Sequence, residues 1–158
     1  MAQEIERKFL VRDESWKVDV SEYFELRQGY LNTPGKASIR VRVDGRQAFL
    51  NIKSVTLGIQ RHEYEYPIPL ADANEMLDLL CEGPRIEKTR YHVRHGEHLW
   101  EIDVFHGDNN GLVVAEIELS SADERFARPD WLGEEVSHDP RYFNVSLVRL
   151  PYKDWALS

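Results

Sequence analysis

Carboxylates and cations recur at every second position in several short segments, and each segment carries mostly one sign of charge. The paired carboxylates are Glu4 and Glu6, Glu101 and Asp103, and Glu116 and Glu118. The cations are Lys8, Arg40, Arg42, Lys53, Lys88 and Arg90. Carboxylate oxygens suit hard divalent cations such as Mg²⁺ or Mn²⁺, whereas Arg and Lys clusters suit polyphosphates. Together these residue types predict metal-dependent phosphoryl chemistry.

Regular alternation of apolar and polar residues predicts that these charges lie on β-strands. About eight such runs are present, at 3–11, 23–31, 37–43, 47–54, 60–68, 85–94, 98–105 and 112–119. Turn residues such as Asp44-Gly45 and His95-Gly96 separate the runs, which indicates antiparallel hairpins. Side chains two positions apart share one face of a strand, so each charged set lies opposite an apolar face. Eight strands are also enough for a sheet to close on itself.

Helical signals are few. Asp72 is predicted to cap a helix that ends at Gly83-Pro84 and packs its apolar stripe on the outside of the sheet. Shorter helices are predicted at Ser121 and at Asp139-Pro140. The predicted fold class is therefore α+β, in a single domain that covers residues 1–158.

The charged faces have two interpretations. A sheet with one wet outer face is common and would explain any one strand. A solvent face normally mixes both signs of charge, however, because like charges beside one another on a sheet are destabilising. If the sheet closes with the charged faces inward, one lumen contains an acidic wall for metal and a basic wall for phosphate.

Composition excludes several classes of protein. Asp and Glu number 28 against 20 Lys and Arg, a net charge of −8, which disfavours a nucleic-acid partner. Cys81 is the only cysteine, so no intrachain disulfide is possible and a reducing cytoplasmic location is expected. No uncharged stretch approaches the ~20 residues of a membrane span, and no signal peptide or membrane anchor is expected.

In order along the chain, these residues resemble the CYTH superfamily, also called the triphosphate tunnel metalloenzymes. The hallmark of that family, Glu-x-Glu-x-Lys, corresponds here to Glu4-Ile5-Glu6-Arg7-Lys8. Further matching segments follow at 28–31, 40–42, 52–53, 61–65, 88–91, 101–105, 111–118, 131–136 and 141–144. The chain is most similar to the compact bacterial inorganic triphosphatases.

The resemblance implies a closed eight-stranded antiparallel β-barrel, a tunnel that encloses the substrate, with a few helices packed outside. The implied metal ligands are Glu4, Glu6, Asp103, Glu116 and Glu118. The implied catalytic and triphosphate-binding residues are Lys8, Arg40, Arg42, Lys53, Lys88 and Arg90. Arg61 would also bind substrate, or form a structural ion pair with Glu63 instead. The implied cofactor is Mg²⁺ or Mn²⁺, as two ions.

The implied activity is metal-dependent hydrolysis of the terminal phosphoanhydride of inorganic triphosphate, with nucleoside triphosphates as secondary substrates. A class IV-type adenylyl cyclase is less favoured, because only Met1-Ala2-Gln3 precede the motif where that branch carries a His-Phe pair. A thiamine triphosphatase would need an aromatic platform, and a non-catalytic polyphosphate-binding module would keep only the basic residues. The tail at 145–158 would either cover one tunnel mouth or pair with a second subunit in a homodimer.

Overall fold

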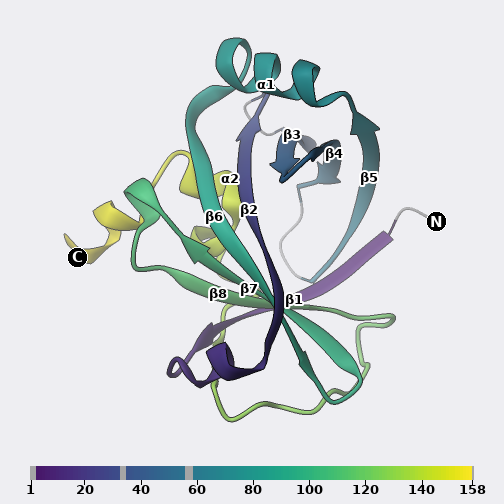
Figure 1. The fold of residues 1–158 in the computed structure, drawn as a ribbon, viewed down its shortest axis with the longest axis vertical. Helices are drawn as coiled ribbons and strands as arrows, with labels where there is room; N and C mark the ends of the chain where they lie inside the picture. Colours follow the sequence, from purple (N-terminus) through teal and green to yellow (C-terminus); the bar gives the residue numbers. More distant parts are fainter. Residues whose placement is uncertain (1–2, 33–34, 56–58, 158) are drawn as a thin grey trace.

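A computed structural model describes residues 3–32, 35–55 and 59–157, and within them nine strands form one antiparallel sheet (Figure 1). The strands are β1 (Gln3–Val11), β2 (Val20–Tyr30), β3 (Ala37–Asp44), β4 (Gln47–Ser54), β5 (Gln60–Ile68), β6 (Glu82–His95), β7 (His98–Phe105), β8 (Val113–Glu118) and β9 (Leu132–Glu135). Their order is β5-β4-β3-β2-β6-β7-β8-β1-β9, and β5 also pairs with β1. This last pairing closes eight strands into the expected barrel. The ninth strand, β9, pairs with β1 and was not predicted from the sequence.

The barrel closes through a short seam between β1 and β5. Within the described residues the seam runs from the pair Gln3 and His62 to the pair Ile5 and Gln60. The pairing of β6 with β7 is longer and extends from Lys88 to the turn at His95. Within the described residues, these pairs and one further hydrogen bond, from Glu6 N to Ile59 O at 2.9 Å, are the few main-chain contacts of the seam.

The two faces of the barrel wall differ as the alternation predicts. Val41 of β3 is fully buried outside the barrel, where it packs with Leu77 of helix α1 (Leu70–Leu79). In Figure 1 this helix lies above the ends of the strands. The neighbouring Arg40 and Arg42 line the interior of the barrel. These apolar side chains thus pack outside the wall, and the interior is lined mostly by polar and charged side chains.

A larger apolar cluster covers the outer face of β1, β7 and β8. Phe9, Trp100 and Ile117 are fully buried there. Trp16, from a short 3-10 helix that precedes β2, and Trp131, from the chain between β8 and β9, pack over them. Burial of one large apolar side chain contributes roughly 1.5–3 kcal/mol, so this cluster stabilises the closed barrel from outside.

The main helix differs from its prediction at both ends. It begins at Leu70 after Pro69, and Asp72 lies in its first turn without capping it. Gly83 and Pro84 do not end the helix, because they already belong to β6. Within the described ranges, no helix is long and apolar enough to cross a membrane.

The segment from Ser121 forms no helix, contrary to the prediction. The carboxylate of Glu124 accepts a hydrogen bond from the main-chain nitrogen of Ser120 at 2.6 Å and contacts His98 Nε2 at 2.5 Å. The Glu124 side chain therefore holds this loop against β7. At Asp139 the prediction is confirmed by a single 3-10 turn, Pro140–Tyr142, which the Asp139 carboxylate caps.

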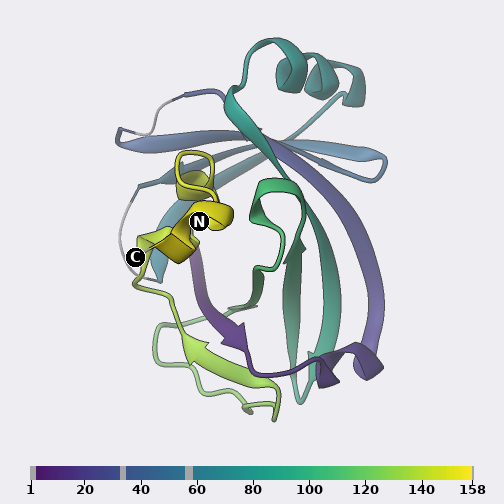
Figure 2. The ribbon, with the colours of Figure 1, turned by 90° about the vertical axis from the view of Figure 1, so that its left-hand side faces the viewer.

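The C-terminal segment folds back onto the barrel (Figure 2). Leu147 of helix α2 (Asn144–Leu147) is buried against Tyr30 and Phe105, and a last 3-10 helix covers Tyr152–Leu157. This segment also contributes side chains to the interior cavity. Of the two roles expected for the tail, covering the tunnel is therefore supported, and the homodimer stays a prediction.

Candidate active site

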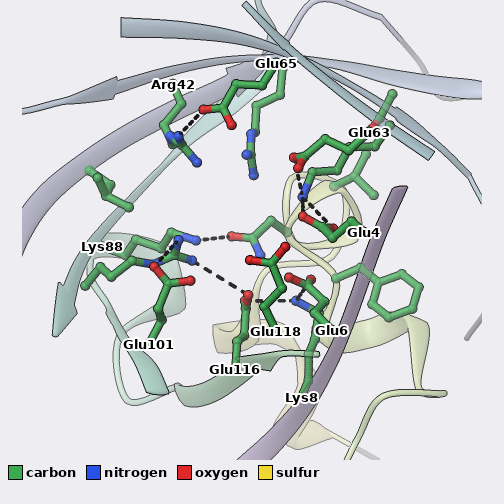
Figure 3. A pocket seen from close by; sticks show the side chains of 18 of the residues that line it. Glu4, Glu6, Lys8, Arg42, Glu63, Glu65, Lys88, Glu101, Glu116 and Glu118 are labelled. Atoms are coloured by element: carbon green, nitrogen blue, oxygen red, sulfur yellow. Dashed lines mark hydrogen bonds and ion pairs between the residues drawn. The ribbon is translucent and has the colours of Figure 1, made fainter. Parts of the chain in front are cut away.

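The interior of the barrel is a polar cavity of about 320 Å³ lined by side chains from all eight closed strands (Figure 3). The charged lining residues are Glu4, Glu6, Lys8, Arg40, Arg42, Asp44, Lys53, Arg61, Glu63, Glu65, Lys88, Arg90, Glu101, Glu116 and Glu118. Every residue predicted for the site is among them except Asp103. Side chains far apart in the sequence are thus brought into one enclosed space by the alternation of each strand.

Acidic and basic side chains alternate in space instead of forming two separate walls. Lys8 Nζ lies 3.2 Å from Glu6 and 2.9 Å from Glu116. The strand register places Lys8 opposite Glu116 and Glu4 opposite Arg61. Opposite charges that face each other across strands are favourable, and this pairing overturns the expectation of one acidic and one basic wall.

Glu4 and Glu6 of β1 are both held by cations from the neighbouring strands. Arg61 Nε donates to Glu4 Oε1 at 3.0 Å, and Arg61 Nη2 donates to Glu6 Oε1 at 2.9 Å. Lys53 Nζ lies 3.2 Å from Glu4 Oε1 and 3.3 Å from Glu63 Oε2. The two carboxylates of the Glu-x-Glu motif therefore lie in a dense network of charges.

Glu118 is the lining carboxylate that a bound cation would stabilise most directly. It lies directly opposite Glu6 on the neighbouring strand, an unfavourable pairing of like charges. Burial raises the pKa of Glu118, and the charges of Glu4 and Glu6 raise it further. Within the described residues Glu118 forms neither an ion pair nor a side-chain hydrogen bond.

Asp103 lies behind the cavity wall, where it holds two cations. Lys88 Nζ donates to Asp103 Oδ2 at 2.8 Å, and Arg90 donates to both oxygens at 2.8 and 2.9 Å. Burial lowers the pKa of Lys88 to about 8, against the effect of Asp103. Burial alone would raise the pKa of Asp103, but Arg90 and Lys88 hold it below its usual range. The role of Asp103 as a metal ligand stays a prediction.

Glu116 and Lys8 form the second buried pair of the tunnel. Burial alone would raise the pKa of Glu116, but Lys8 and Arg90 hold it well below its usual range. Burial alone would lower the pKa of Lys8, but Glu116 and Glu6 raise it above its ordinary value. Both groups are therefore charged at neutral pH.

Arg40 and Arg42 offer donors that the protein itself leaves available. Arg40 Nε reaches Asn51 Oδ1 at 3.4 Å, and no carboxylate lies within ion-pair distance of Arg40 in the described ranges. Arg42 Nη2 pairs with Glu65 at 3.0 Å, but its buried Nε has no partner among the described residues. Buried donors without acceptors are costly, so an anionic ligand at this end of the cavity would be stabilising.

Asn144 and His92 are two lining residues that sequence reasoning missed. Asn144 Oδ1 accepts hydrogen bonds from Lys88 Nζ at 2.9 Å and from Gln28 Nε2 at 3.0 Å. His92 lies 3.2 Å from both Glu22 and Glu101. His92 could have been found from its parity with Lys88 in β6, whereas Asn144 follows all the predicted strands and carries no periodic signal.

The carboxylates fit a hard divalent cation by their chemistry. They supply only oxygen, which Mg²⁺ and Mn²⁺ prefer, and the unpaired Glu118 faces Glu6. Among the described side chains no three potential ligands already form a cluster, and Arg61 binds one oxygen each of Glu4 and Glu6. Glu4, Glu6, Glu116 and Glu118 are the residues that would hold such ions.

Comparison with known proteins agrees with this geometry. The CYTH domain matches residues 2–152. An inorganic triphosphatase of Acetivibrio thermocellus is 46% identical over 155 residues, which cover 98% of this chain and 99% of the relative. An inorganic triphosphatase of Nitrosomonas europaea is 42% identical over 149 residues, 92% and 96% of the two chains. The crystal structure of an inorganic triphosphatase superimposes with a TM-score of 0.66 at 39% identity and covers 91% of this chain and 96% of its own. The chain therefore belongs to the CYTH family.

Proposed function

We propose that this protein is a divalent-metal-dependent inorganic triphosphatase, which hydrolyses the terminal phosphoanhydride of tripolyphosphate inside the barrel. The observation that carries the proposal is the closed tunnel, in which seven of the eight strands contribute charged side chains to one cavity. The two relatives above, both inorganic triphosphatases, are similar over nearly their whole length and support this substrate.

The charge of the cavity supports metal dependence. Eight carboxylates and seven Lys or Arg side chains line it, so these side chains alone offer no net positive charge to a polyanion. Bound divalent cations would reverse this balance and act as Lewis acids toward the terminal phosphate. We propose Mg²⁺ or Mn²⁺, as two ions, with Glu4, Glu6, Glu116 and Glu118 as the ligands.

The cations would bind and orient the triphosphate. Arg40 and Arg42 have donors available for phosphate oxygens, and guanidinium groups form paired hydrogen bonds with phosphate. Lys8, Lys53, Lys88 and Arg90 would stabilise the charge that develops as the anhydride bond breaks. We propose that Asp103 contributes by fixing Lys88 and Arg90, because both of its oxygens already serve them.

The alternative substrates have weaker support. None of the four Trp residues is among the lining residues described, and Trp16, Trp100 and Trp131 are buried in the outer core. Among the described residues, the aromatic side chains that line the cavity are Phe24, Tyr30 and Phe143, so the cavity offers thiamine no tryptophan platform. A non-catalytic polyphosphate-binding module would gain little from so many carboxylates in its binding cavity.

Phosphate release from tripolyphosphate, pyrophosphate, ATP and thiamine triphosphate tests the proposal, with Mg²⁺, with Mn²⁺ and with a chelator. We expect tripolyphosphate to be cleaved fastest, and only when a divalent cation is present. Binding of tripolyphosphate without metal-dependent release would overturn the proposal and favour the binding module. Faster release from thiamine triphosphate or ATP would overturn the substrate assignment.

A further inference from the structure

Arg61 of β5 lies where the proposed metal ligands meet. Its guanidinium spans both carboxylates of the Glu-x-Glu motif, with Nε on Glu4 at 3.0 Å and Nη2 on Glu6 at 2.9 Å. Its side chain is only 20% exposed, and both carboxylates are more buried still. Charge-assisted hydrogen bonds between buried groups are strong, so Arg61 binds the Glu4 and Glu6 carboxylates tightly.

Arg61 binds one oxygen of each of two carboxylates that a shared metal ion would bind. Glu4 Oε2 faces Lys53 at 3.4 Å, and Glu6 Oε1 also pairs with Lys8. A guanidinium and a divalent cation compete for the same lone pairs and repel each other at close range. Glu118, opposite Glu6, stays without a cation as long as Arg61 keeps this position.

We propose that Arg61 is an internal competitor of the divalent cation: it holds Glu4 and Glu6 in the metal-free tunnel and leaves them when metal binds. This inference rests on the proposed function, because it assumes that those carboxylates bind metal. It assigns to Arg61 a role distinct from substrate binding and from a fixed structural ion pair with Glu63.

The short pairing between β1 and β5 gives a physical reason for a cation at Arg61. Without a cation, Glu4, Glu6 and Glu118 would repel one another beside the few main-chain contacts between β1 and β5. Arg61 lies opposite Glu4 in that seam and neutralises the cluster. It therefore stabilises the closed metal-free barrel, and its displacement lowers the apparent affinity for metal.

The three possible roles of Arg61 predict different results for Arg61→Gln. A competitor predicts tighter metal binding and a less stable metal-free protein. A substrate contact predicts a higher KM for tripolyphosphate with unchanged metal affinity. A fixed structural ion pair predicts lower stability with equal or weaker metal binding.

The test is Mn²⁺ binding to the substrate-free protein by titration calorimetry, together with thermal unfolding in chelator. For Arg61→Gln we expect the dissociation constant for Mn²⁺ to fall by about tenfold, the scale of one charge-assisted hydrogen bond. The matched control is Arg42→Gln, which removes a cation of the same cavity that pairs with Glu65 and not with Glu4 or Glu6. An equal fall in both variants would reflect the overall field and overturn the proposal, as would an unchanged or larger constant in Arg61→Gln.

Two further measurements test the proposal even if Arg61→Gln does not fold. Arg61→Lys keeps the charge but cannot span both carboxylates, so its Mn²⁺ affinity should lie above that of the wild type; an unchanged affinity contradicts the proposal. In the wild type labelled with ¹⁵N-arginine, saturating Mg²⁺ should speed solvent exchange of the Arg61 Nε proton. A proton that stays protected would refute displacement. If the wild type does not bind Mn²⁺, or if Glu4→Gln still binds it, the proposed function itself fails. This outcome differs from failure of the Arg61 proposal alone, in which the wild type binds Mn²⁺ through Glu4 but Arg61→Gln does not bind it more tightly.

Discussion

Replacement of Asp103 by Asn tests whether one buried carboxylate holds Lys88 and Arg90 in place. Asp103 is fully buried and binds Lys88 and Arg90 at 2.8 to 2.9 Å. Asp103→Asn would remove the carboxylate that Lys88 contacts at 2.8 Å and would leave Arg90 with longer ion pairs, at 3.4 Å to Glu101 and 3.8 Å to Glu116. Loss of one partner from a buried ion pair costs about 3–5 kcal/mol, a large part of the roughly 5–15 kcal/mol of a typical domain.

The size of the effect can be followed by urea and thermal unfolding. Buried Trp16 and Trp100 provide a fluorescence signal for the transition. At roughly 2–4 °C per kcal/mol for a chain of this length, Tm should fall by roughly 6–20 °C. The matched control is Asp108→Asn, which removes an exposed carboxylate 3.3 Å from Lys153 and should cost less than about 1 kcal/mol.

The pH dependence of the loss gives an independent check. Lys88 has a lowered pKa of about 8, so above that pH it is neutral in the folded wild type, and removal of Asp103 can only lower this pKa further. The difference in stability between the wild type and Asp103→Asn should therefore shrink as the pH rises through about 8. A loss below about 1 kcal/mol at neutral pH would refute the reasoning.

Three further predictions follow from single side chains. Glu118→Gln should reduce phosphate release by about 100-fold. It should also raise the stability of the metal-free protein, measured by unfolding in chelator, because burial and the charges of Glu4 and Glu6 raise the pKa of Glu118. The hydrogen bond to Glu101 raises the pKa of His92, so an NMR titration should show a lower His92 pKa in Glu101→Gln. Protonated His92 adds its full stability to the folded protein below about pH 6.5, and this stability is lost as the pH rises above the folded pKa. Asn144→Ala should lower kcat more than it raises KM, because Lys88 loses a positioning acceptor, and unchanged steady-state kinetics would contradict this.

Much of the barrel could be predicted because strand periodicity reports burial directly. The alternation in β3 places Val41 outside and Arg40 inside, and the structure confirms both positions. The helix boundaries and β9 were missed because tertiary contacts override local signals. Glu124, for example, binds His98 and the chain at Ser120 instead of capping a helix.

The lining residues of the strands could be predicted, but their pairing could not. Parity assigns Glu6 and Lys8 to the interior, yet only the register shows that Glu6 faces Glu118 and Lys8 faces Glu116. Asn144 reaches Lys88 because the tail packs on the barrel, a long-range contact without a local signature.

The central claim is that one enclosed cavity holds both metal and triphosphate. The most direct test is a crystal structure with Mn²⁺ and an imido-linked, non-hydrolysable triphosphate, with Mn²⁺ located by anomalous scattering. We predict Mn²⁺ beside Glu4, Glu6 and Glu118, and phosphate oxygens on Arg40 and Arg42. Phosphate or metal bound only on the outer surface, with the interior ion pairs intact, would contradict the account.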